Sequence, residues 1–96
     1  MIDSNDPNRW FWDYAFQAEN QESYPKIVRD EVMTLADEIT EIANLGIDPN
    51  ELGEKTGGSA RRHTLPCGGW FEIQALPNVR PRVLFVVLIV PPPHLL

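Results

Sequence analysis

The sequence predicts a single α+β domain in which an N-terminal helix or helices pack on a small antiparallel sheet of three to four strands. Apolar residues recur at helical spacing over residues 23–44, and two strand-like runs follow between residues 70 and 90. The 96 residues are enough for one hydrophobic core, and the hydrophobic content of 43% is that of a folded chain. We therefore expect one domain over residues 1–96, with the polar residues 1–9 disordered.

Aromatic side chains alternate in the next segment, at Trp10, Trp12, Tyr14 and Phe16. This alternation is typical of a strand, although Phe11 adds an aromatic to the otherwise polar side, so the segment is either a short strand or the entry to a helix. A row of rings can stack on bases or fill a core. Core packing is the commoner use of aromatics at this density, and we favour it.

An amphipathic helix is predicted between Ser23 and Asn44, because one face is apolar and the other is charged. The apolar stripe consists of Val28, Val32, Leu35, Ile39 and Ile42. Ser23 is expected to cap the helix and Pro25 to lie in its first turn, and Gly46 follows its end. The apolar stripe is expected to pack on a sheet of the same domain.

A loop rich in glycine is expected over residues 46–58, with one helical turn at 49–53. The strands expected after it cover residues 61–65, 70–76 and 82–90, the last two joined as a hairpin. The run at 82–90 is almost continuously apolar, which indicates a central strand covered on both faces. Three prolines at 91–93 end it, because proline has no N–H for the ladder.

Charge is divided unevenly along the chain. Residues 1–55 hold thirteen acids against four bases, a net charge of −9, and residues 56–96 hold four arginines against Glu72, a net charge of +3. The cationic potential of the C-terminal half therefore comes from these arginines alone. They form either a functional basic patch or ordinary flanks of strands, and composition does not separate the two.

Several classes of protein find no support in the sequence. The apolar run from Val83 to Val90 is far shorter than the roughly 20 residues of a membrane-spanning helix. Metal-binding and nucleotide-binding motifs are missing, so we expect neither a metal nor a cofactor. A lone Cys67 and the lack of a secretory leader pattern predict a cytoplasmic protein, with Cys67 as a passive thiol.

Two short motifs on the expected hairpin point to a family. Trp70-Phe71-Glu72-Ile73-Gln74 stands on the first strand and Arg82-Val83-Leu84-Phe85-Val86 on the second, after the Gly-rich segment Leu52 to Ser59. Over roughly residues 25–90 the chain resembles the RelE/HigB/ParE superfamily of bacterial toxins, in its HigB-like and phage Gp49-like branches. The resemblance implies a toxin of a type II toxin–antitoxin system, which cleaves mRNA on the ribosome and is held inactive by a cognate antitoxin.

The resemblance also implies a catalytic face. Arg82 matches the arginine of the family's second motif and would neutralise phosphate charge, because a guanidinium binds phosphate in a bidentate manner. The other candidates are not fixed by a motif: Arg61, Arg62 and Arg80 for RNA binding, and His63 and His94 for proton transfer, where flanking arginines would lower the pKa of His63. Gln74 departs from the family, which has an arginine there.

A second hypothesis is a noncatalytic interaction protein of phage or mobile-element origin. Its acidic helix surface would meet a basic partner or imitate nucleic-acid phosphates. The acids expected on this surface are Asp30, Glu31, Asp37, Glu38 and Glu41. The direction of the arginine side chains separates the two hypotheses. Convergence on one concave face favours catalysis, and dispersal favours binding.

Overall fold

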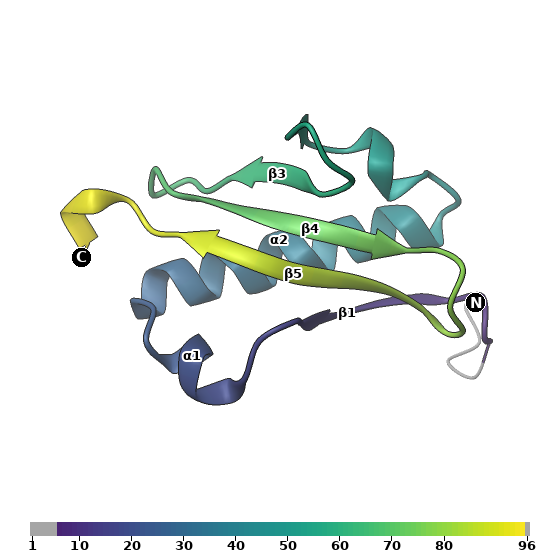
Figure 1. The fold of residues 1–96 in the computed structure, drawn as a ribbon, viewed down its shortest axis with the longest axis horizontal. Coiled ribbons are helices and arrows are strands. Elements are labelled where there is room, and N and C mark those ends of the chain that lie inside the picture. Colours follow the sequence, from purple (N-terminus) through teal and green to yellow (C-terminus); the bar gives the residue numbers. More distant parts are fainter. Residues whose placement is uncertain (1–5, 96) are drawn as a thin grey trace.

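The computed structural model describes residues 6–95 and contains one long helix and five strands (Figure 1). The helical elements are α1 (Ala18–Glu22), α2 (Lys26–Asn44) and the 3-10 turns η1 (Pro49–Glu51) and η2 (Pro93–Leu95). The strands are β1 (Trp10–Tyr14), β2 (Glu54–Lys55), β3 (Arg61–Thr64), β4 (Trp70–Leu76) and β5 (Arg82–Val90). The α+β class is therefore confirmed. The disorder expected for residues 1–9 falls partly outside the described residues, whereas residues 6–9 form a turn in which Arg9 N donates to Asp6 O at 3.1 Å.

The sheet has the order β1-β5-β4-β3-β2 and is mixed, because β1 runs parallel to β5 while the other pairs are antiparallel. The expectation of three to four antiparallel strands was wrong in both respects. The segment 10–14 is a strand, and the long helix returns the chain so that β1 and β5 run in the same direction. The strand β2 has only two residues, both exposed, in a segment expected to be a loop. A strand this short has no hydrophobic alternation that a sequence pattern can detect.

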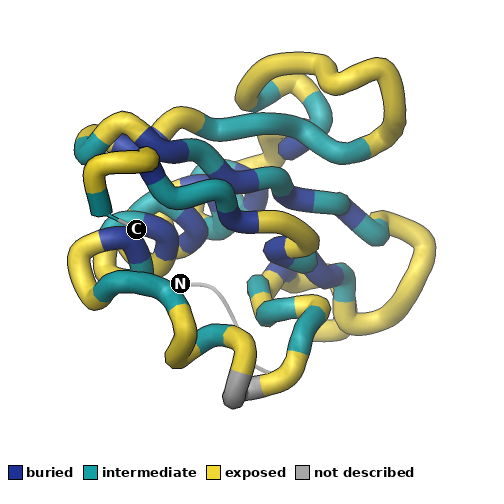
Figure 2. The backbone as a smooth tube through the Cα atoms, turned by 60° about the vertical axis from the view of Figure 1, so that its left-hand side comes forward, coloured by how far each residue is buried: buried dark blue, intermediate teal, exposed yellow. Residues whose placement is uncertain are grey.

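The helix α2 lies behind the sheet in Figure 1 and supplies one side of the core. Its buried residues are Val28, Val32, Ala36, Ile39 and Ala43. All of them except Ala36 belong to one core cluster with Phe71, Ile73, Leu84 and Val86 of the sheet. Trp12, Tyr14 and Phe16 pack against this cluster, as expected for core aromatics. Figure 2 shows these buried stretches on the helix and on the strands that face it.

The start of the helix differs from the prediction. Pro25 is the N-cap of α2 instead of a residue of its first turn. Ser23 donates from its hydroxyl to the carbonyl of Asn20 at 2.6 Å, so it belongs to the end of α1 and does not cap α2. The proline fixes the backbone at this point, and the serine side chain has a nearer acceptor.

The second face of the sheet is not covered by any described element, which corrects the prediction that β5 is buried on both sides. Val87 and Leu88 of β5 are 39% and 41% exposed. We call this side the open face, and the strand registers assign to it Phe11, Asp13, Arg62, Thr64, Trp70, Glu72, Gln74, Leu76, Val83, Phe85, Leu88 and Val90. In Figure 1 it faces the viewer.

The free edge of β1 is partly closed by the helix. Asn44 accepts from the backbone N–H of Trp10 at 2.7 Å and donates to its carbonyl at 3.1 Å. The Trp12 ring donates to Asp37 at 2.6 Å. The Asn44 side chain thus takes the place of a neighbouring strand at Trp10, which blocks pairing of another chain there.

No helix among residues 6–95 is long and apolar enough to cross a membrane.

Candidate functional site

Arg61 is directed to the helix side of the sheet, where it holds a loop. Its register partner is the buried Ile73. Its Nε donates to the carbonyl of Asn50 at 2.7 Å, and one terminal nitrogen lies 3.2–3.3 Å from the carbonyls of residues 58–60. The guanidinium therefore binds the backbone of the loop on both sides of β2, which is a structural role.

Arg62 points the opposite way, because alternate residues of a strand face opposite sides of a sheet. On the open face its guanidinium carbon lies 3.7 Å from the centre of the Trp70 ring, and it forms an ion pair with Glu72 at 3.1 Å. These three residues form the main cluster of charged and aromatic groups on the open face. A cation over an indole face with an adjacent carboxylate is largely neutralised within the chain.

Arg80 and Arg82 lie at the other end of the β4–β5 hairpin. Arg80 donates to the carbonyls of Pro77 and Val79 within the turn, at 2.6 and 2.8 Å. Arg82 donates through Nε to the carbonyl of Asn8 at 2.6 Å, and its guanidinium lies 4.8 Å from the centre of the Trp10 ring. Both guanidinium groups thus bind nearby backbone carbonyls.

The predicted cationic residues consequently do not converge. Arg61 is level with Val86 across β4, so its backbone lies roughly 16 Å from that of Arg82, two strand spacings across and four residues along. His94 is exposed in η2, beyond the other end of β5 from Arg82. A phosphate contacts its ligands within about 3 Å, so no single phosphate can meet Arg61, Arg82 and His94 together.

His63 lies on the helix side of β3, half-buried, with its ring centre 5.5 Å from that of Phe71. Burial lowers the pKa of His63 below its ordinary value. The direction agrees with the sequence analysis, but the cause is different. Removal from water is the reason, since it disfavours the charged imidazolium, and the charge of the flanking arginines does not contribute.

The depressed pKa predicts that acid destabilises the protein through His63. The unfolded chain takes up a proton near the ordinary histidine pKa of about 6.5, whereas the folded chain resists until a lower pH, so stability falls as the pH drops below about 6.5. We expect His63→Gln to reduce this pH dependence. Urea unfolding at pH 7.5 and at pH 5 measures it for both proteins. An identical loss of stability in the two would show that His63 is not responsible.

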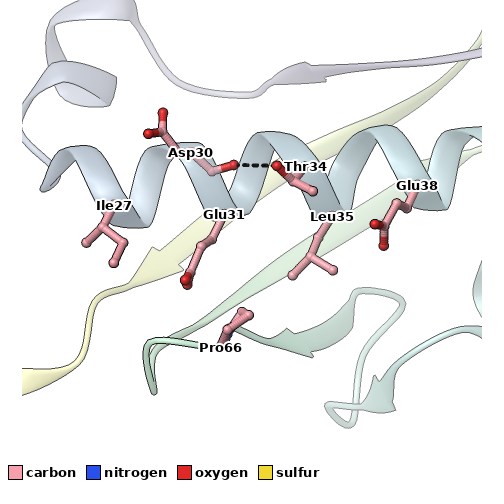
Figure 3. Close-up of a pocket in the computed structure, with 7 residues that line it drawn as sticks. All are labelled: Ile27, Asp30, Glu31, Thr34, Leu35, Glu38 and Pro66. Atoms are coloured by element: carbon pink, nitrogen blue, oxygen red, sulfur yellow. Dashed lines mark hydrogen bonds between the residues drawn. The ribbon is translucent and has the colours of Figure 1, made fainter.

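A groove runs between α2 and the turn that joins β3 to β4, with a volume of about 290 Å³ (Figure 3). Its lining consists of Ile27, Asp30, Glu31, Thr34, Leu35, Glu38 and Pro66. In Figure 3 the side chains of Ile27, Glu31, Leu35 and Glu38 project from the helix toward the side on which Pro66 lies, and Asp30 points away. Apolar and acidic groups thus alternate along one flank of the helix.

Glu31 joins the two walls of this groove. Its carboxylate accepts from the backbone N–H of Cys67 at 3.0 Å, which fixes the turn against the helix. Burial raises the pKa of the Cys67 thiol, and the neighbouring Glu31 adds to this effect. A thiolate is therefore disfavoured at neutral pH, in agreement with a passive cysteine.

The acids expected on one helix surface are divided between two sides of α2. Asp30, Glu31 and Glu38 line the groove, whereas Asp37 binds the Trp12 ring and Glu41 lines a different hollow with Arg9 and Asn44. Asp30 also pairs with Lys26 at 2.6 Å, with both side chains largely exposed. Leu35 was expected in the stripe that packs on the sheet, but it is only partly buried and lines the groove with Ile27, two turns away. The opposite wall comes from Pro66, so the helix pattern alone could not reveal the groove.

No group of three or more histidine, cysteine or acidic side chains within residues 6–95 is placed to hold a metal ion. Searches against protein-family models, curated proteins and solved structures found no match.

Proposed function

We propose that this chain is a noncatalytic interaction module that binds a cationic, partly apolar segment of a partner protein in the groove between α2 and Pro66. The dispersal of the arginines carries the proposal. All four arginines of the C-terminal half bind carbonyls or a carboxylate of their own chain, at separate places on the sheet, so they do not gather around one phosphate as RNA cleavage requires.

The composition of the groove supports a protein segment as its occupant. Ile27 is 49% exposed, and Leu35 and Pro66 complete an apolar floor between carboxylates. Imitation of nucleic-acid phosphates needs charge without exposed apolar surface, because a DNA-binding site offers mainly basic and polar contacts. An apolar floor with an acidic rim instead complements an amphipathic segment that carries lysine or arginine.

The spacing of the two central acids specifies this segment further. Glu31 and Glu38 are seven residues apart on α2, which separates them by about 10.5 Å along the helix axis. Basic residues seven positions apart on a partner helix match this distance, as do basic residues three positions apart on an extended segment. The apolar side chain between them would contact Leu35.

A synthetic amphipathic peptide with two lysines seven residues apart and leucines between them tests the proposal, through fluorescence anisotropy at low and high salt. We expect Glu38→Lys to weaken binding at least about fivefold, because an exposed attraction becomes a repulsion of similar size. Glu41→Lys is the matched control, since it makes the same charge change on the same helix outside the groove. Equal effects of the two substitutions, or no binding by the wild type, would contradict the proposal.

Endoribonuclease activity of the RelE/HigB type, with a ribosome-bound mRNA substrate and a cognate antitoxin, remains the second candidate. One observation favours it: the two motif-bearing strands pair as an antiparallel hairpin. They place Trp70, Glu72 and Gln74 together on the open face, beside Arg62. Growth arrest on induction of the wild type in bacteria, but not of Arg82→Ala, would favour this candidate and argue against the noncatalytic proposal.

A further inference from the structure

The open face of the sheet is mostly apolar and nearly neutral, unlike the rest of the molecule. Its charged residues are Asp13, Arg62 and Glu72, a net charge of −1 in a chain of −6. Its polar groups are largely satisfied within the chain, since Arg62 pairs with Glu72 and Gln74 accepts from Ser59 at 2.7 Å. Covering this face therefore removes apolar surface from water without leaving a strong charge unpaired.

We propose that the open face binds the open face of a second copy of this chain, so that the protein forms a twofold-symmetric dimer with the two sheets stacked. An acidic chain repels its own copies, and contact is least unfavourable where the charge is lowest. Sheets stack about 10 Å apart when the facing side chains are apolar, as they are here over most of β4 and β5.

The positions of the charges are self-complementary. A twofold interface requires that residues on one side of its axis match those on the other. With an axis along the strands between β5 and β4, β1 of one copy lies over β3 of the other. Across the sheet, Asp13 of β1 is level with Gln74, and Arg62 of β3 is level with Glu72. Asp13 of one copy and Arg62 of the other are therefore displaced by about 7 Å along the strands, a distance that an arginine side chain can span. Arg62 already pairs with Glu72 of its own chain, so in the dimer its guanidinium would lie between Glu72 and the other copy's Asp13, at both edges of the contact.

The same axis brings apolar groups together along the centre. Val90 of β5 meets Trp70 of β4 at one end, because they are a level pair in adjacent strands. At the other end Leu76 lies over Val83, which is itself only 5% exposed. Leu88, 41% exposed, lies between them over Glu72, whose charge is paired with Arg62. Trp70, Leu76, Leu88 and Val90 thus supply the apolar part of the centre of the interface.

The contact area of the proposed dimer indicates how tightly the two copies would bind. Four strands at about 4.8 Å spacing and about 23 Å length give a footprint of roughly 440 Å² per copy, or about 900 Å² in total. Specific interfaces start near about 1,000 Å². The dimer should therefore be weak and form only well above about 1 µM. Its two α2 grooves would face outward, since the helix and the open face lie on opposite sides of the sheet.

Sedimentation velocity of the full chain from about 1 µM to about 1 mM tests the dimer. We expect the wild type to change from one to two copies over this range. Leu88→Glu should remain a monomer, and Asp13→Lys should weaken association at least about fivefold. Met33→Glu is the matched control, because Met33 is 48% exposed on α2, and it should dimerise like the wild type.

Three results would overturn the proposal: a wild type that stays monomeric throughout, a Leu88→Glu variant that dimerises normally, or equal weakening by Met33→Glu. Circular dichroism of each variant shows whether it is folded. If Leu88→Glu is unfolded, Asp13→Lys decides, because Asp13 is exposed and its substitution leaves the core intact. Peptide binding by the groove is measured separately, so failure of the dimer does not affect the result for the groove.

Discussion

Phe71→Ala is expected to lower the free energy of unfolding by about 3–5 kcal/mol, the range for removal of a buried phenylalanine ring. Phe71 is fully buried, and its ring lies between the sheet and α2. Small domains are stable by about 5–15 kcal/mol, so this single change removes much of the margin. Urea unfolding followed by circular dichroism measures the difference.

Phe85→Ala is the control for this prediction, because it removes the same ring from the other face of the sheet. Phe85 is only partly buried, on the open face beside Gln74. We expect a loss of about 1 kcal/mol, since little of the ring leaves a packed environment. The measurement is made at about 1 µM, where the proposed dimer is dissociated. Equal losses in the two variants would show that the sheet does not have one covered and one open face.

Gly53→Ala is expected to cost about 2–4 kcal/mol, the combined effect of backbone strain and steric overlap. Gly53 has a φ of +89°, a conformation that alanine disfavours. A Cβ there would lie 2.7 Å from the carbonyl oxygen of Arg62 and 2.7 Å from Cε1 of His63. The carbonyl belongs to the backbone of β3 and cannot move without loss of the strand.

Gly57→Ala separates the two contributions. Gly57 has a φ of +91°, yet a Cβ there would meet nothing within 4 Å. It should therefore cost only the backbone strain, about 1 kcal/mol. Thermal unfolding of the two variants gives the comparison. If Gly57→Ala costs as much as Gly53→Ala, the close approach of β3 to Gly53 contributes nothing.

Local patterns predicted most elements well. The strands at 70–76 and 82–90 have the predicted bounds, and the helix ends at Asn44 as expected. These segments have strong periodicity that extends over several turns or pleats, and proline or glycine marks their ends. The strand β2 and the cap at Pro25 were missed, because each depends on one or two residues whose partners are distant in sequence.

For the candidate site, the sequence could predict only which residue types take part. Sequence identified the arginines and the acids of α2, but not where their side chains point. Arg61 and Arg62 are neighbours in the chain and face opposite sides of the sheet, one bound to the backbone of Asn50 and the other over Trp70. Any arginine can donate hydrogen bonds to backbone carbonyls. No sequence motif therefore indicates which arginines bind the backbone of their own chain.

The sequence by itself determined the α+β class, the long amphipathic helix and the separation of negative from positive halves, because these follow from side-chain type and local spacing. Only the tertiary structure decided that β1 joins the sheet parallel to β5, that one face of the sheet stays open, and that Pro66 meets Ile27 and Leu35 to form a groove. These features depend on contacts between residues far apart in the chain, and a local pattern does not specify such contacts.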